Sequence, residues 1–512
     1  MIAKQKVLLV VMDGLGVAPK SEGNAVVLAN PVHLSTLWNT NPHTYLLASG
    51  EAVGLPKDVK GNSEVGHQNL GSGQIIKQTL PRINSAIERG YFLKSSVLYN
   101  SLVHASRNNG NIHIMGLLSD GSVHSHISHF FAILRYFSQN NFKNHVYFHI
   151  FTDGRDTGVN QAKDFIAQLE RHIEMQGIGE IATICGRSYA MDRNNTWERT
   201  KTAYDLITKG VGEKFEHWQE AIDQSYQNGV TDEFLKPIVI KDAKVKPGDS
   251  VIHANFRADR ALQLTSAFID QSFTNFPREI IPNLFFASMV EYRKNFPTNV
   301  LVAKQYITMP LGRVLSSNSF KQLRIAESEK FPHVTYFFNG GMSIRYDMED
   351  RIEIPSPSVP LYDQKPEMSA EEMTDILINR IEADIYDFIL VNFANPDMVG
   401  HTGNLEASIK AVQTVDKCVD DLVRVFTSKG GCVILTADHG NAEELLNIDT
   451  GEMDTEHSLN PVPLILIGSK IPPRVLQYGA LKDVAPTILQ LMGALQPMEM
   501  TGKSLIGDIE IF

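Results

Sequence analysis

The strongest constraint on the fold of this chain is an apolar run that occurs three times and ends each time beside an aspartate. The runs are 7–12, 388–393 and 432–436, followed by Asp13, Asp397 and Asp438. A run that is apolar at every position is typical of a parallel strand buried on both faces. Because ligands bind outside the carboxyl ends of such strands, neighbouring runs would bring three carboxylates to one sheet edge.

Histidines accompany these aspartates. Asp397 and His401 are four residues apart, so they share one face if the turn between them opens a helix. Asp438 and His439 are adjacent, so on a loop they would diverge and could serve two different ions. His457 follows in a polar loop before another apolar run. These positions predict a metal site.

Ser63 lies in a short polar turn between two glycines, directly before residues that can begin a helix. A serine in this setting is usually a helix N-cap. The amides of a helix start also favour an anion, so a phosphate on or beside Ser63 would be stabilised there. One serine oxygen together with carboxylates and imidazoles suits Mn²⁺ or Zn²⁺ better than Mg²⁺ or Ca²⁺, which prefer shells made of oxygen alone.

Four further strand-like runs, in the middle of the chain, lead into polar loops rich in arginine. The runs are 112–118, 146–151, 181–185 and 250–256, and the arginines are Arg155, Arg187, Arg193, Arg257 and Arg260. Arginine is suited to bidentate capture of carboxylate and phosphate oxygens. The chain has 47 Lys+Arg against 58 Asp+Glu, a net charge of −11, which argues against a general nucleic-acid or anionic-membrane surface. The arginines therefore predict a local pocket for a small polyanion.

The order of these signals predicts two α/β domains. Metal-ligand candidates lie at both ends of the chain and the arginines lie between them, so we expect a discontinuous metal domain, 1–76 plus 311–512, with a second α/β domain, 77–310, inserted. A length of 512 residues agrees with more than one hydrophobic core. After the insert we expect a strand at 334–338, preceded by Lys330, and helices that cover the sheet at 371–385, 407–426 and 481–492.

Cysteine usage and the absence of long apolar runs indicate the compartment. The three cysteines are far apart and form no CxxC, so they predict no disulfide framework and fit a reducing cytosol. The run 7–12 is too short for a signal peptide or a membrane span, and we find no other candidate. We expect a cytoplasmic protein without membrane or nucleic-acid partners.

Seven motifs together resemble the cofactor-independent phosphoglycerate mutases of the alkaline phosphatase superfamily. They lie at collinear spacing at 12–14, 61–67, 152–157, 255–260, 326–330, 396–403 and 436–441. The metal core alone is shared across the superfamily, whereas the arginine motifs are not. The resemblance implies an alkaline-phosphatase-like metal domain with a phosphotransferase insert, and interconversion of 3-phosphoglycerate and 2-phosphoglycerate in glycolysis and gluconeogenesis, without 2,3-bisphosphoglycerate.

The same resemblance implies roles for individual residues. It implies two Mn²⁺ per chain, one held by Asp397, His401 and His457, the other by Asp13, Ser63, Asp438 and His439. Ser63 would be the nucleophile that becomes phosphorylated, and Asp156 would move protons to and from the glycerate hydroxyls. The substrate would be bound by His124, Arg155, Asp156, Arg187, Arg193, Arg257, Arg260 and Lys330. The family also implies a monomer.

Alternatives stay open at this point. Another superfamily phosphatase or a phosphopentomutase would share the metal positions, and the arginine motifs of the insert are what favour a phosphoglycerate mutase. A non-catalytic phosphate-binding protein is disfavoured by Ser63 and by the complete set of metal positions. Zn²⁺, Co²⁺ or Fe²⁺ could replace Mn²⁺. His67, four residues after Ser63, receives no chemical role.

Overall fold

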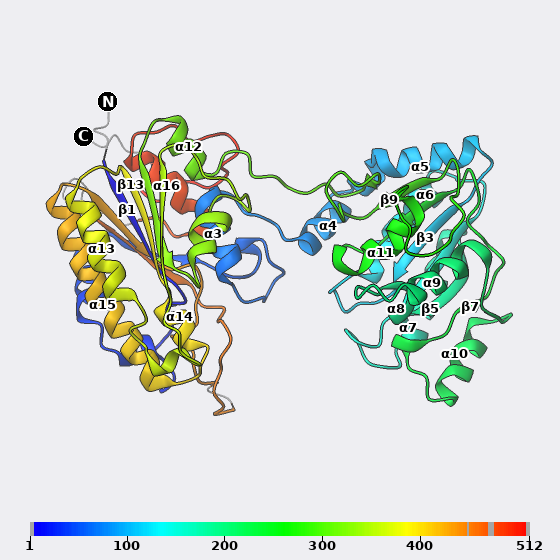
Figure 1. Ribbon diagram of the computed structural model, residues 1–512, viewed down its shortest axis with the longest axis horizontal. Coiled ribbons are helices and arrows are strands. Elements are labelled where there is room, and N and C mark those ends of the chain that lie inside the picture. Colours follow the sequence, from blue (N-terminus) through cyan, green and yellow to red (C-terminus); the bar gives the residue numbers. More distant parts are fainter. Residues whose placement is uncertain (1–4, 448–449, 469–475, 508–512) are drawn as a thin grey trace. The chain divides into compact units, whose positions relative to one another are not determined.

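The apolar runs of the chain assemble into two separate sheets, each the centre of one structural unit (Figure 1). The computed structural model describes residues 5–447, 450–468 and 476–507. Unit 1 comprises Met1–Gln78 and Gln305–Phe512, and unit 2 comprises Thr79–Lys304. Within the described residues, helices accompany a sheet of eight strands in each unit, which confirms two α/β domains.

In unit 1 the three aspartate-ended runs are adjacent parallel strands. The sheet order is β12-β11-β13-β1-β14-β15-β2-β16. These strands are β1 Val7–Met12, β2 His43–Leu47, β11 Gln322–Glu327, β12 Glu349–Ile354, β13 Phe388–Phe393, β14 Cys432–Thr436, β15 Val462–Ile467 and β16 Gly479–Ala480. Strand β1 pairs in parallel with β13 on one side and with β14 on the other, so all three run to the same edge.

Helices cover both faces of this sheet. They are α1 Ala25–Leu28, α2 Val32–Thr40, α3 Ser63–Ser72, α12 Leu311–Ser317, α13 Ala370–Glu382, α14 Asn395–Gly400, α15 Leu405–Ser428 and α16 Val484–Leu491. Figure 1 shows α13 and α15 side by side along one face, with α3, α12 and α16 on the other. Helix α15 buries Val415, Val419, Leu422 and Phe426, whose spacing of three and four places them on one side. The three predicted covering helices are thereby confirmed.

The predicted strand at 334–338 is wrong, because the structure has a π-helical turn, His333–Phe337, at this place. Val334 and Phe338 are buried, whereas Tyr336 between them is 37% exposed, so the buried positions are four residues apart instead of alternating. The Thr335 hydroxyl donates to the carbonyl of Phe331, four residues earlier, as in a helix. The β-branched and aromatic composition mimics a strand, and tertiary packing decides otherwise.

Unit 2 has the sheet order β10-β9-β8-β3-β4-β5-β7-β6. Its strands are β3 Ile112–Leu117, β4 Val146–Thr152, β5 Glu180–Gly186, β6 Glu213–Lys214, β7 Ile238–Val239, β8 Ser250–His253, β9 Phe285–Ser288 and β10 Asn299–Val300. Its helices are α4 Thr79–Glu88, α5 Ser96–Arg107, α6 Ile127–Gln139, α7 Ala162–Gln176, α8 Arg187–Ala190, α9 Trp197–Lys209, α10 Trp218–Gln227 and α11 Ala258–Ile269. Strands β8, β3, β4 and β5 are parallel neighbours, so the arginine-bearing loops leave one edge.

The remaining expectations about the chain concern its thiols and membranes. Cys185, Cys418 and Cys432 are free and buried, as expected for residues that pack as small apolar side chains. Among the described residues, the structure contains no helix of sufficient length and apolarity to span a membrane.

Candidate active site

The carboxyl ends of β13, β1 and β14 bring Asp397, Asp13 and Asp438 together in unit 1. Each of the three side chains is at most 2% exposed. Three carboxylates in one buried place require cationic partners or metal ions, because an unpaired buried charge is costly. This edge of the sheet therefore needs positive charge to balance its carboxylates, which ordinary apolar packing does not.

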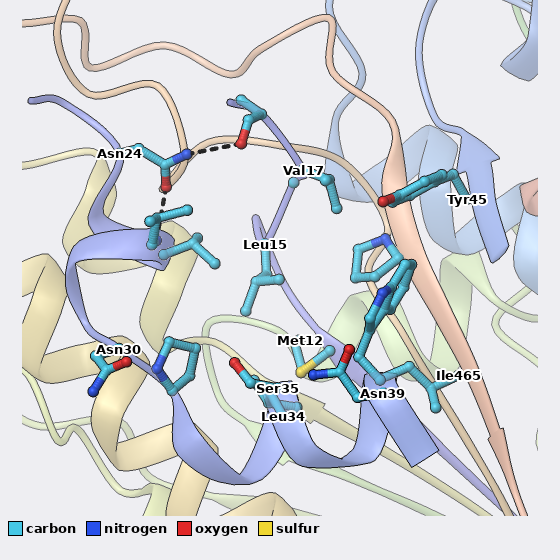
Figure 2. Close-up of a pocket in the computed structure, with 17 residues that line it drawn as sticks. Met12, Leu15, Val17, Asn24, Asn30, Leu34, Ser35, Asn39, Tyr45 and Ile465 are labelled. Atoms are coloured by element: carbon cyan, nitrogen blue, oxygen red, sulfur yellow. Dashed lines mark hydrogen bonds between the residues drawn. The ribbon is translucent and has the colours of Figure 1, made fainter. Parts of the chain in front are cut away.

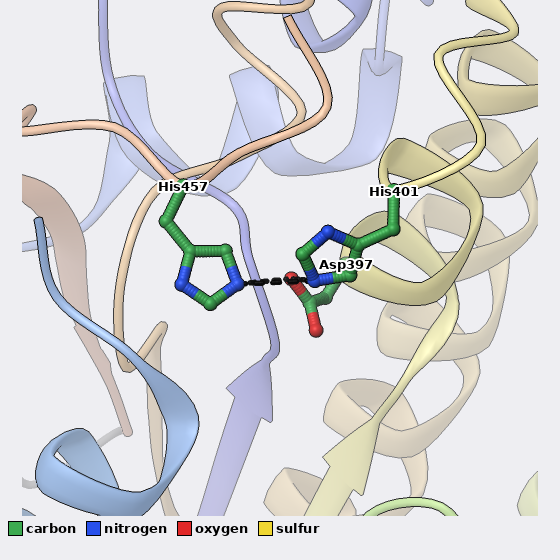
Figure 3. Close-up of side chains that lie close together, drawn as sticks. All are labelled: Asp397, His401 and His457. Carbon is green, nitrogen blue, oxygen red and sulfur yellow. Dashed lines mark hydrogen bonds and ion pairs between the residues drawn. The ribbon is translucent and has the colours of Figure 1, made fainter. Parts of the chain in front are cut away.

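One cluster joins Asp397 to two histidines (Figure 3). The Nε2 atoms of His401 and His457 each lie 3.3 Å from Asp397 Oδ1 and 3.1 Å from each other. His401 Nδ1 lies 2.8 Å from the Thr455 carbonyl, and His457 Nδ1 lies 2.8 Å from the Gly61 carbonyl. A backbone carbonyl at Nδ1 fixes the tautomer that leaves Nε2 free to bind a metal.

A second cluster surrounds Ser63. Its Oγ lies 3.2 Å from Asp13 Oδ1 and 2.9 Å from His439 Nε2. His439 Nε2 is in turn 3.4 Å from Asp13 Oδ1 and 3.7 Å from Asp438 Oδ2. The usual reading of such a serine as an N-cap is wrong, since Asn62 caps α3 and accepts from the Val65 amide. Ser63 is the first residue of the helix, and its hydroxyl points to the cluster.

Lys330 links the two clusters. Its Nζ lies 2.6 Å from Asp13 Oδ1, 2.5 Å from Asp397 Oδ2 and 2.8 Å from Ser63 Oγ. Burial alone would lower the pKa of Lys330, but Asp13 and Asp397 raise that pKa overall. Burial alone would raise the pKa of both aspartates, yet Lys330 brings each well below its usual value. Lys330 is thus a buried ammonium and not the solvated surface side chain that lysine usually is.

The donor set fits divalent transition metals. Within the described residues, three groups place their ligand atoms within 4.8 Å of one another: Asp397 with His401 and His457, Asp13 with Asp397 and His439, and Asp13 with His67 and Asp438. Among the described residues, the buried Asp438 Oδ2 forms no hydrogen bond and lies only at ion-pair distances from His67 Nδ1 and His439 Nε2. A single ammonium against three buried carboxylates leaves negative charge, and mixed oxygen and imidazole donors are typical of Mn²⁺ or Zn²⁺ sites.

Protons compete with metal ions for the nitrogen atoms of these imidazoles. Burial lowers the pKa of His439, but the neighbouring Asp438, Asp13 and Asp397 raise it overall to about 10. The hydrogen bond to Asp397 is the main reason why the pKa of His401 is raised. A metal that binds here must displace those protons, so its affinity is coupled to pH.

Two residues to which the sequence assigned no chemical role, His67 and Asn392, hold the aspartates in place. His67 Nδ1 lies 2.9 Å from the Ser63 carbonyl and 3.1 Å from Asp438 Oδ2. Asn392 Nδ2 donates to Asp13 Oδ2 at 2.7 Å and lies 3.1 Å from His67 Nε2. The available signals were the four-residue spacing of Ser63 and His67, and the fact that Asn392 is the one polar residue in the apolar run of β13.

Unit 2 gathers the arginine candidates around carboxylates, of which Asp153 is buried and Asp156 and Asp259 are partly exposed. Arg187 is buried, and its Nη1 lies 2.5 Å from both Asp153 Oδ1 and Asp156 Oδ2. Asp153, which sequence reasoning left unassigned, accepts from the Asp156 amide at 3.0 Å and from the Ser119 hydroxyl at 2.6 Å. Burial would raise the pKa of Asp153, but these donors and Arg187 lower it overall. Asp153 therefore fixes both Arg187 and the loop that carries Asp156.

Asp259 organises the other side of this edge. Its carboxylate lies 3.0 Å from Arg193 Nη1, 3.2 Å from Arg257 Nε and 3.8 Å from His124 Nδ1. His124 is buried, with Nε2 4.0 Å from Asp156 Oδ2, and burial together with Arg187 lowers its pKa to about 4. His124 is therefore neutral near pH 7.

Two arginines complete the cluster. Arg260 Nη1 donates to the Met191 carbonyl at 3.1 Å, and Arg155 Nη1 lies 3.5 Å from Glu233 Oε1. Burial and the nearby Arg187, Arg193 and Arg155 lower the pKa of Arg260. The structure thus brings seven of the eight predicted substrate residues together in unit 2, while the eighth, Lys330, lies beside Ser63 in unit 1.

A cavity of about 420 Å³ in unit 1 lies apart from these clusters (Figure 2). Leu15, Trp38 and Tyr45 are among the residues that line it, and its lining in the described part of the chain includes none of the predicted site residues. Among the described residues that line it, none is charged, in contrast to the two sheet edges.

Comparison with known families defines the class of protein. Residues 83–294 match the family described as BPG-independent PGAM N-terminus, and residues 312–459 match type I phosphodiesterase / nucleotide pyrophosphatase. Together with the buried Asp and His clusters, these matches define a metal-dependent enzyme with an alkaline-phosphatase-like domain.

Full-length relatives define the family. A 2,3-bisphosphoglycerate-independent phosphoglycerate mutase of Clostridium beijerinckii is 46% identical over 511 residues, covering 99% of each chain, and that of Moorella thermoacetica is 47% identical, covering 98% of each. The crystal structure of Leishmania mexicana phosphoglycerate mutase at low cobalt concentration matches with 31% identity and a TM-score of 0.56, covering 98% of each chain. The chain belongs to the 2,3-bisphosphoglycerate-independent phosphoglycerate mutases, which confirms the resemblance, and it is an isomerase.

Proposed function

We propose that this chain interconverts 3-phosphoglycerate and 2-phosphoglycerate through a phosphoserine at Ser63, with two Mn²⁺ ions and without 2,3-bisphosphoglycerate. The observation that carries the proposal is the position of Ser63 Oγ, which lies within 3.2 Å of Asp13, His439 and Lys330 at the first residue of α3. A serine hydroxyl is a weak nucleophile near neutral pH, and this environment is suited to activate it.

The two Asp and His clusters would hold the ions. Asp397, His401 and His457 would hold one, and Asp13, Ser63, Asp438 and His439 the other. When bound, the ions would lower the pKa of the serine hydroxyl and stabilise charge on the transferring phosphoryl oxygens. Another divalent transition metal, such as Co²⁺ or Zn²⁺, would suit the same donors.

Lys330 and the start of α3 would stabilise the phosphoryl group on Ser63. The Lys330 ammonium already donates to Ser63 Oγ, so it can neutralise charge that develops on this oxygen or on the phosphoryl group it receives. The first amides of α3 also favour an anion at the same place.

The arginine cluster of unit 2 would hold the glycerate. Arg155, Arg193 and Arg257 have half-exposed side chains that can reach a carboxylate or phosphate. Arg260, Arg187 and His124 would bind the same substrate. Asp156, held by Arg187, would move protons to and from the two glycerate hydroxyls. We accordingly assign residues 1–76 plus 311–512 as the metal-binding domain and 77–310 as the substrate-binding phosphotransferase domain.

Transfer to the other hydroxyl requires that the dephosphorylated glycerate is retained and that water is excluded. Both domains must act on one molecule, so we expect them to close when substrate binds, with hinges near residues 77 and 310. Small-angle scattering should show a smaller radius of gyration with phosphoglycerate. An unchanged radius would contradict domain closure.

We further propose a cytoplasmic monomer. Three buried free thiols suit a reducing compartment. Light scattering coupled to gel filtration should give a mass near 57.1 kDa, and a larger mass would contradict the monomer.

The deciding experiment is an enolase-coupled assay on 3-phosphoglycerate with Mn²⁺ and without any bisphosphoglycerate. We expect continuous formation of phosphoenolpyruvate. A phosphatase of the same superfamily would instead release inorganic phosphate and form no 2-phosphoglycerate, so phosphate is measured in parallel. Failure to form phosphoenolpyruvate would overturn the proposed function.

A further inference from the structure

Glu443 is a buried carboxylate, 1% exposed, that has no place in the proposed metal clusters. It lies in the loop after β14, and the ion pairs of the described residues pair it with no cation. A carboxylate in this situation needs several hydrogen-bond donors to compensate for lost hydration. Its donors show what it does in the fold.

Both Glu443 oxygens are saturated by donors from two loops, the loop after β1 and the two ends of the connection between β14 and β15. Oε2 accepts from the backbone amides of Gly16 and Asn441, each at 2.9 Å. Oε1 accepts from Asn460 Nδ2 at 3.0 Å and from the Ser458 hydroxyl.

Each of these donor segments also carries a proposed metal ligand. Gly16 follows Asp13 by three residues, on the loop after β1. Asn441 follows the Asp438–His439 pair by two residues, on the loop after β14, and Ser458 comes directly after His457. One carboxylate therefore connects, by hydrogen bonds, residues that lie next to ligands of both proposed ions.

Two glycines make room for this carboxylate. A Cβ atom on Gly16 would lie 2.3 Å from Glu443 Cδ, and a Cβ on Gly440 would lie 2.3 Å from Glu443 Oε1. Neither glycine has a positive φ, so their role is to leave space and not to adopt a left-handed backbone. Gly16 and Gly440 are thus glycines for the same physical reason, since a side chain at either position would collide with Glu443.

We propose that Glu443 is a positioning residue that fixes the loop after β1 and both ends of the β14–β15 connection in one arrangement, so that both metal clusters depend on it. The inference rests on the proposed metal sites and adds a residue that acts through their ligands. Without the Glu443 carboxylate, the Gly16 and Asn441 amides and the Ser458 hydroxyl lose this acceptor. The segments that carry Asp13, His439 and His457 can then move independently. Residues that orient metal ligands in this way typically affect affinity or activity by 10–100-fold.

The test measures Mn²⁺ affinity directly. Free Mn²⁺ is followed by electron paramagnetic resonance during titration of the metal-free protein. Glu443→Gln keeps the size of the side chain but turns an amide group towards two of the donors. We expect its Mn²⁺ dissociation constants to rise about 10–100-fold at both sites. Glu444→Gln is the matched control, because Glu444 is the neighbouring glutamate and accepts from Asn460 Nδ2 at 2.7 Å without bonding the other loops.

A milder variant covers the case in which Glu443→Gln does not fold. Ser458→Ala removes one donor, next to His457, and should weaken Mn²⁺ binding in the same direction by a smaller factor. High Mn²⁺ should restore kcat towards the wild-type value in both variants, because their reacting groups are intact.

The outcomes separate the inference from the proposed function. Wild-type protein that binds no Mn²⁺ would overturn the proposed metal sites. Wild-type binding with unchanged affinity in Glu443→Gln and Ser458→Ala would overturn the inference alone. A lower thermal midpoint of the metal-free variants without any loss of Mn²⁺ affinity would also overturn it, because it would assign Glu443 to stability only.

Discussion

Unit 1 and unit 2 use the same architecture to gather opposite charges. In each, four or more parallel strands end at one edge of a sheet and the loops beyond them carry charged side chains. In unit 1 these are aspartates and histidines around one lysine, which suit cations. In unit 2 they are arginines around a few aspartates, which suit a polyanion. The fold supplies the edge, and a few loop residues decide what it binds.

The histidines of the two units show the same contrast. In unit 1 aspartates raise the pKa of His401 and, to about 10, that of His439. In unit 2 burial lowers the pKa of His124 to about 4 and the pKa of His129 and His253 to about 3. Carboxylates thus favour a cationic ring at His401 and His439, whereas burial keeps the rings of His124, His129 and His253 neutral near pH 7. His333 of unit 1 follows the second pattern, because burial lowers its pKa to about 4.

The largest effect should follow from removing the nucleophile of unit 1. Ser63→Ala should lower mutase turnover on the order of 10⁶-fold, the scale seen when a catalytic nucleophile is lost. The far-ultraviolet circular dichroism spectrum should stay unchanged. Ser72→Ala, at the other end of α3 with its hydroxyl on the Gln74 carbonyl, is the control and should stay active. Substantial turnover by Ser63→Ala would rule out the phosphoserine.

Lys330→Met tests whether unit 1 needs a cation at its carboxylates. Without Lys330, Asp13 and Asp397 are buried without this partner, so the metal-free protein should lose about 3–5 kcal/mol in its free energy of unfolding. Mn²⁺ should recover part of this loss, because it neutralises the same carboxylates. Urea unfolding with and without Mn²⁺ gives both values, and the exposed Lys321→Met is the control. Equal stability of Lys330→Met and wild type would refute this account.

Arg187→Met makes the corresponding change at the edge of unit 2. Two carboxylates, Asp153 and Asp156, lose their shared partner, and the proposed glycerate site loses a cation. We expect KM for 3-phosphoglycerate to rise about 10–100-fold, since a charged hydrogen bond contributes about 1.5–3 kcal/mol. Mn²⁺ affinity should not change, which distinguishes the two edges. Arg199→Met, exposed on α9, is the control, and an unaltered KM in Arg187→Met would contradict the assignment.

The smallest effect concerns pH and the buried histidines of unit 2. The pKa of His129 and His253 is about 3 in the fold and about 6.5 in unfolded chains. As pH falls below 6.5 the unfolded chain binds protons that the folded unit does not, so stability falls until pH reaches about 3. At pH 5 the loss is on the order of 2 kcal/mol for each histidine.

Tryptophan fluorescence can isolate this effect. In a Trp38→Phe variant the remaining tryptophans, Trp197 and Trp218, both lie in unit 2. Its urea midpoint should therefore decrease between pH 7.5 and pH 5.0. A midpoint that is the same at both pH values would show that these rings do not stay neutral.

Much of the molecule could be predicted from local patterns. Runs that are almost entirely apolar predicted β1, β13 and β14, because such a composition is typical of strands covered on both faces. The spacing of Asp397 and His401 predicted their shared face, because it reflects helix geometry. The superfamily and the mutase family followed from motifs that the comparisons confirm.

The rest depends on partners that are distant in the chain. Lys330 is buried because Asp13 and Asp397 surround it, and no pattern around residue 330 reveals that. The burial of Glu443 also depends on distant partners, since its donors come from the loop after β1 and from both ends of the β14–β15 connection. The turn at His333–Phe337 was mistaken for a strand because β-branched and aromatic residues serve both structures, and packing chooses between them.

The position of β1 in the sheet has a consequence for biosynthesis. Among the described strands β1 comes first in the sequence, yet both strands that flank it, β13 and β14, follow it by more than 370 residues. Unit 2 is continuous and can fold while synthesis continues. Strand β1, which Asp13 directly follows, has no sheet neighbours until β13 and β14 have been synthesised. Non-local parallel pairing of this kind is slow. The apolar segment 7–12 therefore stays exposed to chaperones and to aggregation until its neighbours are made.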